Sequence, residues 1–594
     1  MTSLIKVSDY LVQRLAEFGV RHTFMITGGG AMHLNDSFGR CKKIKLIFNH
    51  HEQACAMAAE GYARAKGQLG VVCVTTGPGG LNCLSGLMGA WTDSVPLLFI
   101  SGQVKAQTML STCPQVKLRQ LGDQEVDIIS VVRSLTKFAQ TIYHPHEIDV
   151  ILAQAVTTAL TGRPGPVWID LPMNVQGAML RRQDILPGTW PTKRRPVFGD
   201  LHVLAKAVKY LSQAQRPLLV IGHGVRLAQQ MNELRILMKQ VPIPVATSFN
   251  GMDLVAYHHP LMVGRIGTIG QRAANKALQA ADVILFLGTR NNVRQISYNW
   301  ENFAPQAYKI VVDIDPAELA KPTLRPDLKL NLDLKQVLPY LRKALAKLKL
   351  SLPHLHAWKT WLKQCQGWKK RYTPLSEFPS CPQAKVHPYF FIDQLSSYLK
   401  KSAVIVTANG TASVACFQAL ANKLGQRIIF NSGCASMGYG LPAAIGAAIG
   451  LKRAVICLEG DGSIMMNLQE LQTVKTYHLP LKIFIFNNHS YHSIYQTQHN
   501  FFGNHLTGCH PASGVECPDF VKVGQAFGIK AIKISHQREM KAKLDWVLNC
   551  AGPIICELDC TMDYIFAPKL GSQRLADGKI ISGRLEAMMP PRND

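Results

Sequence analysis

Two short segments of this chain carry the oxygen donors that a hard divalent cation prefers. Residues 460–463 read Gly-Asp-Gly-Ser, and Asn487 and Asn488 follow further along the chain. An Asp carboxylate, an amide oxygen and a backbone carbonyl, completed by diphosphate oxygens, form an all-oxygen set suited to Mg2+. The pattern predicts a site in which Asp461 and Asn488 bind one ion together.

The elements around the two segments explain why we expect them to meet. Residues 454–458 form an apolar run typical of a buried parallel strand, and residues 481–486 form a second run that ends at Asn487. Apolar residues recur at helical spacing between them, from Ile464 to Val474. The right-handed crossover of such a unit brings the carboxyl ends of both strands to one sheet edge, where ligands bind. Each segment alone is also typical of an ordinary turn, so the prediction rests on both together.

Through these segments the chain resembles the thiamine diphosphate-dependent enzymes. The resemblance covers nearly the whole chain and points in particular to the acetolactate (acetohydroxyacid) synthase group. It implies that Asp461, Asn488 and the backbone carbonyl of Ser490 hold Mg2+, which binds the cofactor diphosphate. It also implies that the rest of the first motif belongs to the cofactor site, namely Gly460, Gly462 and Ser463.

Strand and helix patterns alternate along the 594 residues, which predicts an α/β protein with mostly parallel sheets flanked by helices. We expect three domains, at residues 1–185, 197–345 and 386–565. Linkers are predicted at residues 186–196 and 351–385, and residues 566–594 are predicted to form an arm or tail. The resemblance implies a pyrimidine-binding domain, a central Rossmann-like domain and a diphosphate-binding domain, in that order.

The formal charge of +27 raises the alternatives of nucleic-acid or anionic-membrane binding. The basic residues are scattered, however, and their densest runs (residues 193–195, 342–349 and 369–371) lie in or near the predicted linkers. No zinc-finger spacing or RNA-binding aromatic motif accompanies them. We therefore favour a solvated surface with mild steering of anionic substrates, and nucleic-acid binding is not expected.

The fifteen cysteines include no Cys-x-x-Cys pair, and many lie in apolar segments. This usage predicts buried free thiols in a reducing cytoplasm rather than a disulfide framework. The first residues lack the apolar stretch of a signal peptide, and no uncharged run has the length of a membrane span. A cytoplasmic protein without membrane segments is expected.

Glu52 follows a short apolar strand at residues 46–48 and opens a helix that extends through Arg64. From spacing alone it is a first-turn glutamate that complements the helix dipole. The resemblance implies a catalytic role, because residues 51–64 are similar to the family segment that bears its activating glutamate. That role is a hydrogen bond to N1′ of the aminopyrimidine, which favours the tautomer that removes the thiazolium C2 proton. Glu60 is the alternative candidate, and we expect it on the helix surface.

Other candidate residues come from segments that resemble the family's cofactor loops. Met437 is either a core methionine or, by the resemblance, the apolar residue that separates the two cofactor rings. Gly410 and Thr411 match the first diphosphate-contacting loop, although the family often has Gln or His near Thr411. Gly30 and the Gly-Pro-rich residues 75–80 match loops beside the pyrimidine and the substrate.

Two departures concern the acceptor. Gln124 matches the Gln of the synthases' Phe-Gln-Glu motif, which implies a catalytic role, but Asp123 replaces the Phe. Thr497 falls where the synthases have a tryptophan. Both changes make the predicted acceptor site more polar and more open.

The central domain offers a possible FAD site. Residues 288–294 resemble a synthase segment and keep its glycine and both arginines, Gly288, Arg290 and Arg294, and residues 311–316 also fit through Asp313. Residues 267–270 lack the histidine of the synthases. Two interpretations stay open: bound FAD, or a Rossmann-like core without flavin.

The leading hypothesis is a thiamine diphosphate- and Mg2+-dependent carboligase that decarboxylates pyruvate or a related 2-keto acid and passes the two-carbon unit to a carbonyl acceptor. Alternatives within the same chemistry are transfer to a nucleotide-linked keto-sugar and simple decarboxylation to an aldehyde. An alternative of another class is a non-catalytic basic binding protein on this scaffold. The resemblance implies a homodimer or homotetramer with its cofactor sites between subunits.

Overall fold

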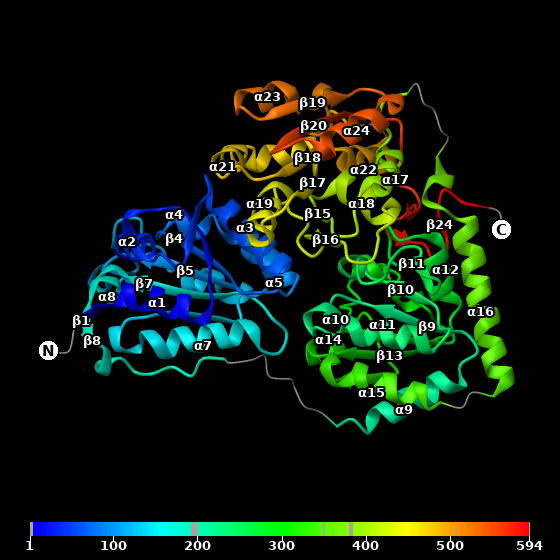
Figure 1. The fold of residues 1–594 in the computed structure, drawn as a ribbon, viewed down its shortest axis with the longest axis horizontal. Coiled ribbons are helices and arrows are strands. Elements are labelled where there is room, and N and C mark those ends of the chain that lie inside the picture. Colours follow the sequence, from blue (N-terminus) through cyan, green and yellow to red (C-terminus); the bar gives the residue numbers. More distant parts are fainter. Residues whose placement is uncertain (1–3, 192–199, 349–350, 379–383, 504, 593–594) are drawn as a thin grey trace.

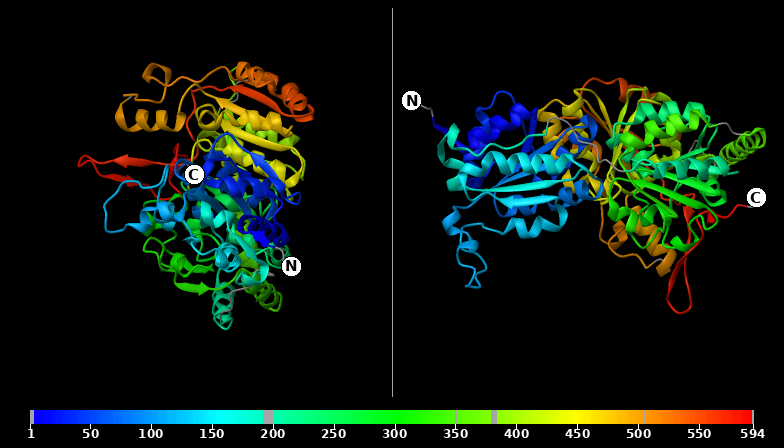
Figure 2. Two further views of the ribbon diagram at one scale, coloured as in Figure 1. Left: turned by 90° about the vertical axis from the view of Figure 1, so that its left-hand side faces the viewer. Right: turned by 90° about the horizontal axis from the view of Figure 1, so that it is seen from below.

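The structure, a computed structural model, describes residues 4–191, 200–348, 351–378, 384–503 and 505–592. Within these ranges it contains three six-stranded parallel sheets, one in each predicted domain, with helices on their faces (Figure 1). The α/β prediction is therefore confirmed. Seen from below in Figure 2, the amino-terminal and central domains lie at opposite ends of the molecule, with the carboxyl-terminal domain between them.

The amino-terminal sheet has the order β3-β2-β4-β5-β7-β6. Its strands are β2 (His22–Met25), β3 (Lys45–Phe48), β4 (Gly70–Val74), β5 (Leu97–Gln103), β6 (Phe138–Thr141) and β7 (Val167–Pro172). Its helices are α1 (Val7–Phe18), α2 (Met32–Arg40), α3 (Glu52–Lys66), α4 (Pro78–Leu81), α5 (Leu84–Thr92), α6 (Ile128–Val132), α7 (Ile148–Leu160) and α8 (Met173–Gly177). A small antiparallel pair joins β1 (Leu4–Lys6) to β8 (Met179–Arg181).

The central sheet has the order β11-β10-β9-β12-β13-β14, which is the doubly wound Rossmann order. Its strands are β9 (Pro217–Ile221), β10 (Val245–Thr247), β11 (Met262–Arg265), β12 (Val283–Leu287), β13 (Tyr308–Asp313) and β14 (Leu328–Asn331). Its helices are α9 (Val203–Gln213), α10 (Gly224–Leu227), α11 (Met231–Gln240), α12 (Arg272–Ala280), α13 (Val293–Ile296), α14 (Pro316–Ala320), α15 (Leu334–Ala346) and α16 (Leu352–Arg371).

The carboxyl-terminal sheet has the order β16-β15-β17-β18-β20-β19 and so repeats the topology of the amino-terminal sheet. Its strands are β15 (Val404–Thr407), β16 (Arg427–Phe430), β17 (Val455–Gly460), β18 (Leu481–Asn487), β19 (Lys530–Ile534) and β20 (Ile554–Asp559). Its helices are α17 (Pro388–Tyr398), α18 (Gly410–Ala419), α19 (Gly440–Leu451), α20 (Asp461–Ile464), α21 (Glu470–Thr476), α22 (His492–Phe502), α23 (Phe520–Ala526) and α24 (Met540–Asn549). The helix expected after the Gly-Asp-Gly-Ser motif is interrupted by the 3-10 turn η10 (Met465–Asn467).

The predicted linker at residues 351–385 is wrong over most of its length, because α16 occupies residues 352–371. The prediction relied on its Pro, Lys and Trp content. Trp358, Trp361 and Cys365 nevertheless recur at helical spacing, and all three are buried against the central domain. Two indole N–H groups also donate to backbone carbonyls near β9, from Trp358 to Ala214 and from Trp361 to Pro217.

The expected carboxyl-terminal tail packs on the central domain. It forms two antiparallel pairs, β21 (Lys569–Leu570) with β24 (Met588–Met589) and β22 (Ser572–Arg574) with β23 (Ile580–Ser582). The β22–β23 hairpin projects from the molecule in Figure 2. The Arg272 guanidinium of α12 donates to the carbonyl of Met588 at 2.8 Å, and the Leu570 N–H donates to the carbonyl of Thr268.

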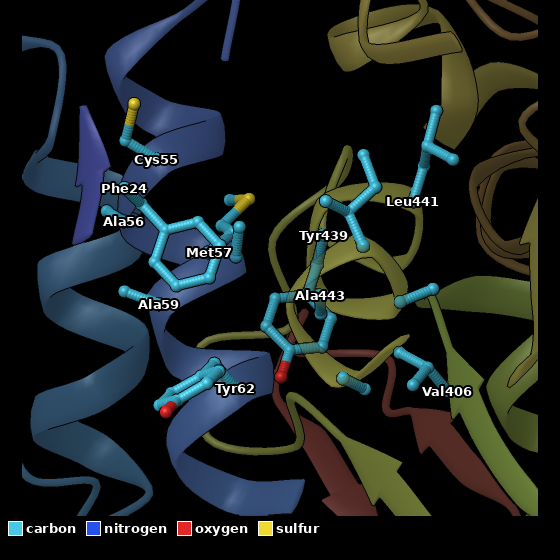
Figure 3. Close-up of a cluster of buried hydrophobic side chains, with 14 of the residues drawn as sticks. Phe24, Cys55, Ala56, Met57, Ala59, Tyr62, Val406, Tyr439, Leu441 and Ala443 are labelled. Carbon is cyan, nitrogen blue, oxygen red and sulfur yellow. The ribbon is translucent and has the colours of Figure 1, made fainter. Parts of the chain in front are cut away.

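The amino- and carboxyl-terminal domains share one core, in which α3 packs along α19 (Figure 3). The two helices approach closely because each presents a glycine to the other. A Cβ on Gly61 would lie 2.1 Å from the carbonyl oxygen of Ala443, and a Cβ on Gly446 would lie 1.8 Å from that of Ala58. This contact fixes the helix that begins at Glu52.

The described cysteines are all free; nine of them are buried as predicted, and five are half-buried. Across the described ranges, no helix has the length and apolar character required to cross a membrane. The basic run at residues 193–195 lies outside the described residues.

Candidate active site

Asp461 and Asn488 lie side by side at the carboxyl edge of the third sheet. They follow β17 and β18, which are paired in parallel with Gly460 opposite Phe486. The Asp461 carboxylate accepts hydrogen bonds from the backbone N–H groups of Gly462 (2.8 Å), Asn488 (3.1 Å) and Ser490 (3.3 Å). The crossover therefore brings together the three residues predicted to hold the metal.

The surroundings of Asp461 suit a cation. Its exposed fraction is 3%, and burial raises the pKa of its carboxyl to about 7. No Lys or Arg within the described ranges pairs with it, although a buried carboxylate is costly without a counter-charge. The Asn488 amide oxygen, which accepts from the Ser490 hydroxyl at 3.2 Å, supplies the second oxygen donor.

This donor set fits Mg2+ and does not fit a softer metal. No cluster of three His, Cys, Asp or Glu side chains that could hold a metal occurs in the part of the chain that the structure describes. A single carboxylate, an amide oxygen and a backbone carbonyl form a hard, incomplete shell that diphosphate oxygens would complete.

The predicted diphosphate loop lies beside this pair. Gly410 opens α18 with a φ of +57°, a conformation that favours glycine. The Thr411 hydroxyl contacts the Tyr564 hydroxyl at 2.8 Å and accepts from the Asn488 amide at 3.3 Å. Gly462 packs against the ring of Tyr491, where an added Cβ would lie 2.0 Å from a ring carbon.

Met437 is half-buried in the segment between β16 and α19. Its loop is fixed on both sides of Gly438, since the Gly438 N–H donates to the Ser463 hydroxyl at 3.1 Å and its carbonyl accepts from the Asn467 amide at 2.8 Å. Ser463 of the predicted metal motif thus holds the loop that presents Met437.

A second group of predicted residues gathers in the amino-terminal domain. The half-buried Glu52 carboxylate accepts from the Asn82 amide at 2.9 Å. Its other oxygen lies 3.7 Å from the position of a Cβ on Gly79, so the 75–80 loop passes beside it. Gly30 faces the same loop, because a Cβ there would lie 2.9 Å from the Thr76 methyl group.

Gln124 contacts this loop through its backbone. Its carbonyl oxygen would lie 2.2 Å from a Cβ on Gly77, which has a φ of +61°. Gln124 itself has a φ of +60°, and its side chain is exposed. The structure places Gln124 at the site's edge, and its catalytic role stays a prediction.

The turn before Glu52 is held by residues that sequence reasoning missed. The buried Glu470 carboxylate of α21 accepts from the His50 N–H and the Asn49 amide, both at 2.8 Å. The Asn467 amide donates to the Gln53 side chain at 3.1 Å. No local pattern marks Glu470 or Asn467, because their partners lie more than 400 positions away.

Glu60 does not lie on the helix surface as predicted. It is fully buried between α3 and α19, where its carboxylate pairs with Arg64 at 3.0 Å and accepts from the Tyr439 hydroxyl at 3.0 Å. The surface expectation rested on its position eight residues beyond Glu52, whereas neighbouring elements bury every residue of α3 from 54 to 64.

The Glu52 group lies in the amino-terminal domain, and the Asp461 group lies in the carboxyl-terminal domain. Among the described residues, the hydrogen bond to the Glu52 side chain comes from Asn82 of its own domain, and none connects Glu52 to Asp461 or Asn488.

All four predicted FAD residues line one cavity at the carboxyl ends of the central strands. The cavity encloses about 1090 Å³ of unfilled space, part of it open to solvent, and its walls include Gly288, Arg290, Arg294 and Asp313. Burial raises the pKa of Asp313 to about 6 and lowers the pKa of Arg294. The Arg294 guanidinium lies 5.0 Å from the centre of the Phe249 ring.

Arg294 and Phe249 also line a smaller cavity of about 560 Å³, which reaches Gly410 and Ser493. The central cavity and the predicted diphosphate loop are therefore neighbours, with one guanidinium between them.

Family comparisons agree with this architecture. Residues 5–131 match the "Thiamine pyrophosphate enzyme, N-terminal TPP binding domain" model, residues 204–341 match the central domain model, and residues 408–558 match the C-terminal TPP binding domain model. Each matched region overlaps one of the three six-stranded sheets.

Individual relatives align along nearly the whole chain. The probable acetolactate synthase large subunit of Methanocaldococcus jannaschii is 32% identical over 93% of this chain and 92% of its own length. The acetolactate synthase large subunit of Cyanidium caldarium is 33% identical over 94% of this chain and 93% of its own length. The acetolactate synthase isozyme 2 large subunit of Escherichia coli K12 is 32% identical over 92% of this chain and 94% of its own length. With three matched domains and relatives of this extent, the chain belongs to the thiamine pyrophosphate-dependent enzymes, among the acetolactate synthase large subunits and their relatives.

Proposed function

We propose that this protein decarboxylates pyruvate or a closely related 2-keto acid and joins the two-carbon unit to a carbonyl acceptor, using thiamine diphosphate and Mg2+. The observation that carries the proposal is the buried Asp461 carboxylate beside Asn488, which lacks a counter-cation among the described residues and lies at a sheet edge. The relatives' names favour acetolactate as product over a keto-sugar adduct or an aldehyde. A non-catalytic basic binding protein is not favoured.

When bound, thiamine diphosphate supplies a ring that accepts the electrons released with carbon dioxide. Asp461, Asn488 and the Ser490 carbonyl would hold the metal, and Gly410 leaves room for the diphosphate. Glu52 would hold a proton at the pyrimidine nitrogen, where general acid–base catalysis requires a carboxyl group within hydrogen-bond reach. The Asn82 amide, which already donates to Glu52, orients that carboxylate.

We also propose that the active site forms between two copies of the chain, in a homodimer or homotetramer. Exposed apolar side chains flank the loop that presents Met437 on both sides: Met88 and Trp91 on α5, and Met465 and Met466 on η10. Met466 packs beside Gly438, and Thr92 at the end of α5 packs beside Gly433. A second copy that covers this surface would bring its Glu52 toward the metal pair.

FAD is the proposed occupant of the central cavity, whose position over a Rossmann-order sheet edge suits a dinucleotide. Arg294 would then lie between FAD and the reaction centre. Since no carboxylate among the described residues pairs with it, we propose that it binds the carboxylate of a keto-acid acceptor. The cytoplasmic location expected from the sequence stays a prediction.

The test uses purified protein with pyruvate, thiamine diphosphate and Mg2+, and measures acetolactate and acetaldehyde. Glu52→Gln should retain cofactor affinity and lose about 100-fold to 10,000-fold in turnover. Asp461→Ala should abolish Mg2+-dependent cofactor retention, measured by calorimetry. Exposed Glu301→Gln and Asp563→Ala are matched controls and should match the wild type. Unchanged turnover in Glu52→Gln, or cofactor retention without metal, would contradict the assignments.

A further inference from the structure

A second large cavity lies where the three domains meet. It encloses about 1660 Å³ of unfilled space, part of it open to solvent. It shares His223, Leu227, Ser94 and Pro164 with the cavity proposed for FAD, so these residues form the wall between the two. Neither the metal pair nor Glu52 lines it.

Four arginines from all three domains line this junction cavity: Arg14 and Arg64 from the amino-terminal domain, Arg226 from the central domain and Arg427 from the carboxyl-terminal domain. The only acidic residue in the described wall is Glu17. The other carboxylates that pair with these arginines do not line the cavity. The described wall therefore contains four arginines and one acidic residue.

The pairing behind the wall leaves positive charge in excess beside Asp253. Its two carboxylate oxygens each bind one guanidinium at 2.9 Å, from Arg226 and from Arg427. One buried carboxylate therefore serves two cations. Burial and the neighbouring Arg226 lower the pKa of Arg427 to about 9, and burial together with these arginines lowers the pKa of His223 well below its ordinary value. An anion in the cavity would relieve this repulsion.

Donor groups at the wall are also unused. The Arg64 side chain is 3% exposed, and its Nε atom is buried without a hydrogen-bond partner. The Arg226 Nε atom is also buried without a hydrogen-bond partner. A buried N–H that lacks an acceptor is costly, and because both atoms are covered, an anionic oxygen would reach them only after the side chains turn toward the cavity.

Apolar side chains form much of the remaining wall, beside polar residues such as Ser94, Thr161 and Gln229. Phe18 and Trp190 contact each other at one side, with ring centres 5.4 Å apart, and Val95, Pro96 and Leu160 lie in the same wall. A site that combines several guanidinium groups with apolar walls suits an organic anion better than an inorganic one.

We propose that the junction cavity binds a small organic anion, a molecule with carboxylate or phosphate groups and an apolar body. Its anionic groups would contact Arg226, Arg64 and Arg427, and its body would lie against Phe18 and Trp190. Because such a ligand touches all three domains, its binding stabilises their arrangement. This proposal does not depend on the proposed reaction.

The experiment uses the holoprotein saturated with thiamine diphosphate, Mg2+ and FAD, so that the other sites are filled. Three probes are titrated at constant ionic strength by calorimetry and by tryptophan fluorescence: inorganic diphosphate, ADP and benzoate. We expect ADP or benzoate to bind at one site per chain and to raise the melting temperature, and to bind more tightly than inorganic diphosphate. ADP binding alone would identify a phosphate ligand, and benzoate binding alone a carboxylate ligand.

Variants then locate the site. Arg226→Gln should weaken binding about tenfold or more, as expected for the loss of a charge-assisted hydrogen bond. Arg14→Gln, at the more exposed rim, is a second variant with less risk to folding and should also weaken binding. Trp190→Phe should remove the fluorescence change. The matched control is Arg235→Gln on the exposed face of α11, which should bind as the wild type does. Absence of binding by every probe, or equal binding by all these variants, would overturn the proposal.

Discussion

At the scale of single residues, the buried Glu60 predicts a pH dependence of stability. Burial raises its pKa from 4.5 to about 7, and this effect outweighs the opposing influence of Arg64. The folded chain therefore holds this proton more tightly than the unfolded chain does. The free energy of unfolding that Glu60 contributes falls as pH rises from about 4.5 through about 7. The loss is complete about one pH unit above the pKa of the folded state.

Replacing Glu60 with Gln should remove this dependence while it keeps the size of the side chain. We expect the melting temperature of the wild type to fall more steeply than that of Glu60→Gln between about pH 5 and about pH 8. Parallel melting curves for the two proteins across this range would contradict the prediction. Glu301→Gln, an exposed change, should follow the wild type and serves as the control.

At the scale of elements, the closeness of α3 and α19 predicts that Gly61 tolerates no side chain. A methyl group at Gly61 would meet the backbone oxygen of Ala443 at 2.1 Å, so the helices must separate. Overpacking of this kind costs about 1–3 kcal/mol. Since α3 begins at Glu52, the shift should also lower turnover.

The matched control is Gly39→Ala in α2, where nothing lies within 4 Å of the added Cβ. That change should leave stability equal or raise it by up to about 1 kcal/mol through helix propensity. Chemical denaturation of both variants measures the difference. Equal stability of Gly61→Ala and Gly39→Ala would show that the helix contact adapts.

Elements were predictable where local pattern and burial agree. Strand β18 begins at Leu481, the residue expected from the sequence, because continuous apolar runs are typical of strands covered on both faces. Helix α16 was missed because its polar and basic residues, four lysines among them, resemble a linker, while its buried stripe consists of only a few residues such as Trp358 and Trp361. The overall composition of such a helix reflects its exposed residues, whereas the spacing of its few apolar residues reveals its buried face.

At the scale of the whole molecule, the sequence predicts those parts of the site whose residues lie on elements adjacent in the chain. Asp461 and Asn488 meet because a single crossover joins their strands. The role of Glu470 and the junction cavity could not be predicted from the sequence, because both depend on how separate domains pack together. The same holds for Glu52 and the metal pair, which lie in different domains and are the subject of the final prediction.

If two copies complete the site, then disrupting the surface beside the Met437 loop should abolish assembly and catalysis together. Trp91 on α5 is 37% exposed and lies on that surface. Trp91→Lys would place a charge in an apolar interface, where it loses its hydration, so we expect monomers and weak cofactor binding. Sedimentation velocity over a concentration series measures the assembly, and calorimetry measures thiamine diphosphate affinity. Trp546→Lys, 48% exposed on α24, is the matched control and should assemble normally. A wild-type monomer with full activity would refute the shared site, since Glu52 would then have to reach the metal pair of its own chain.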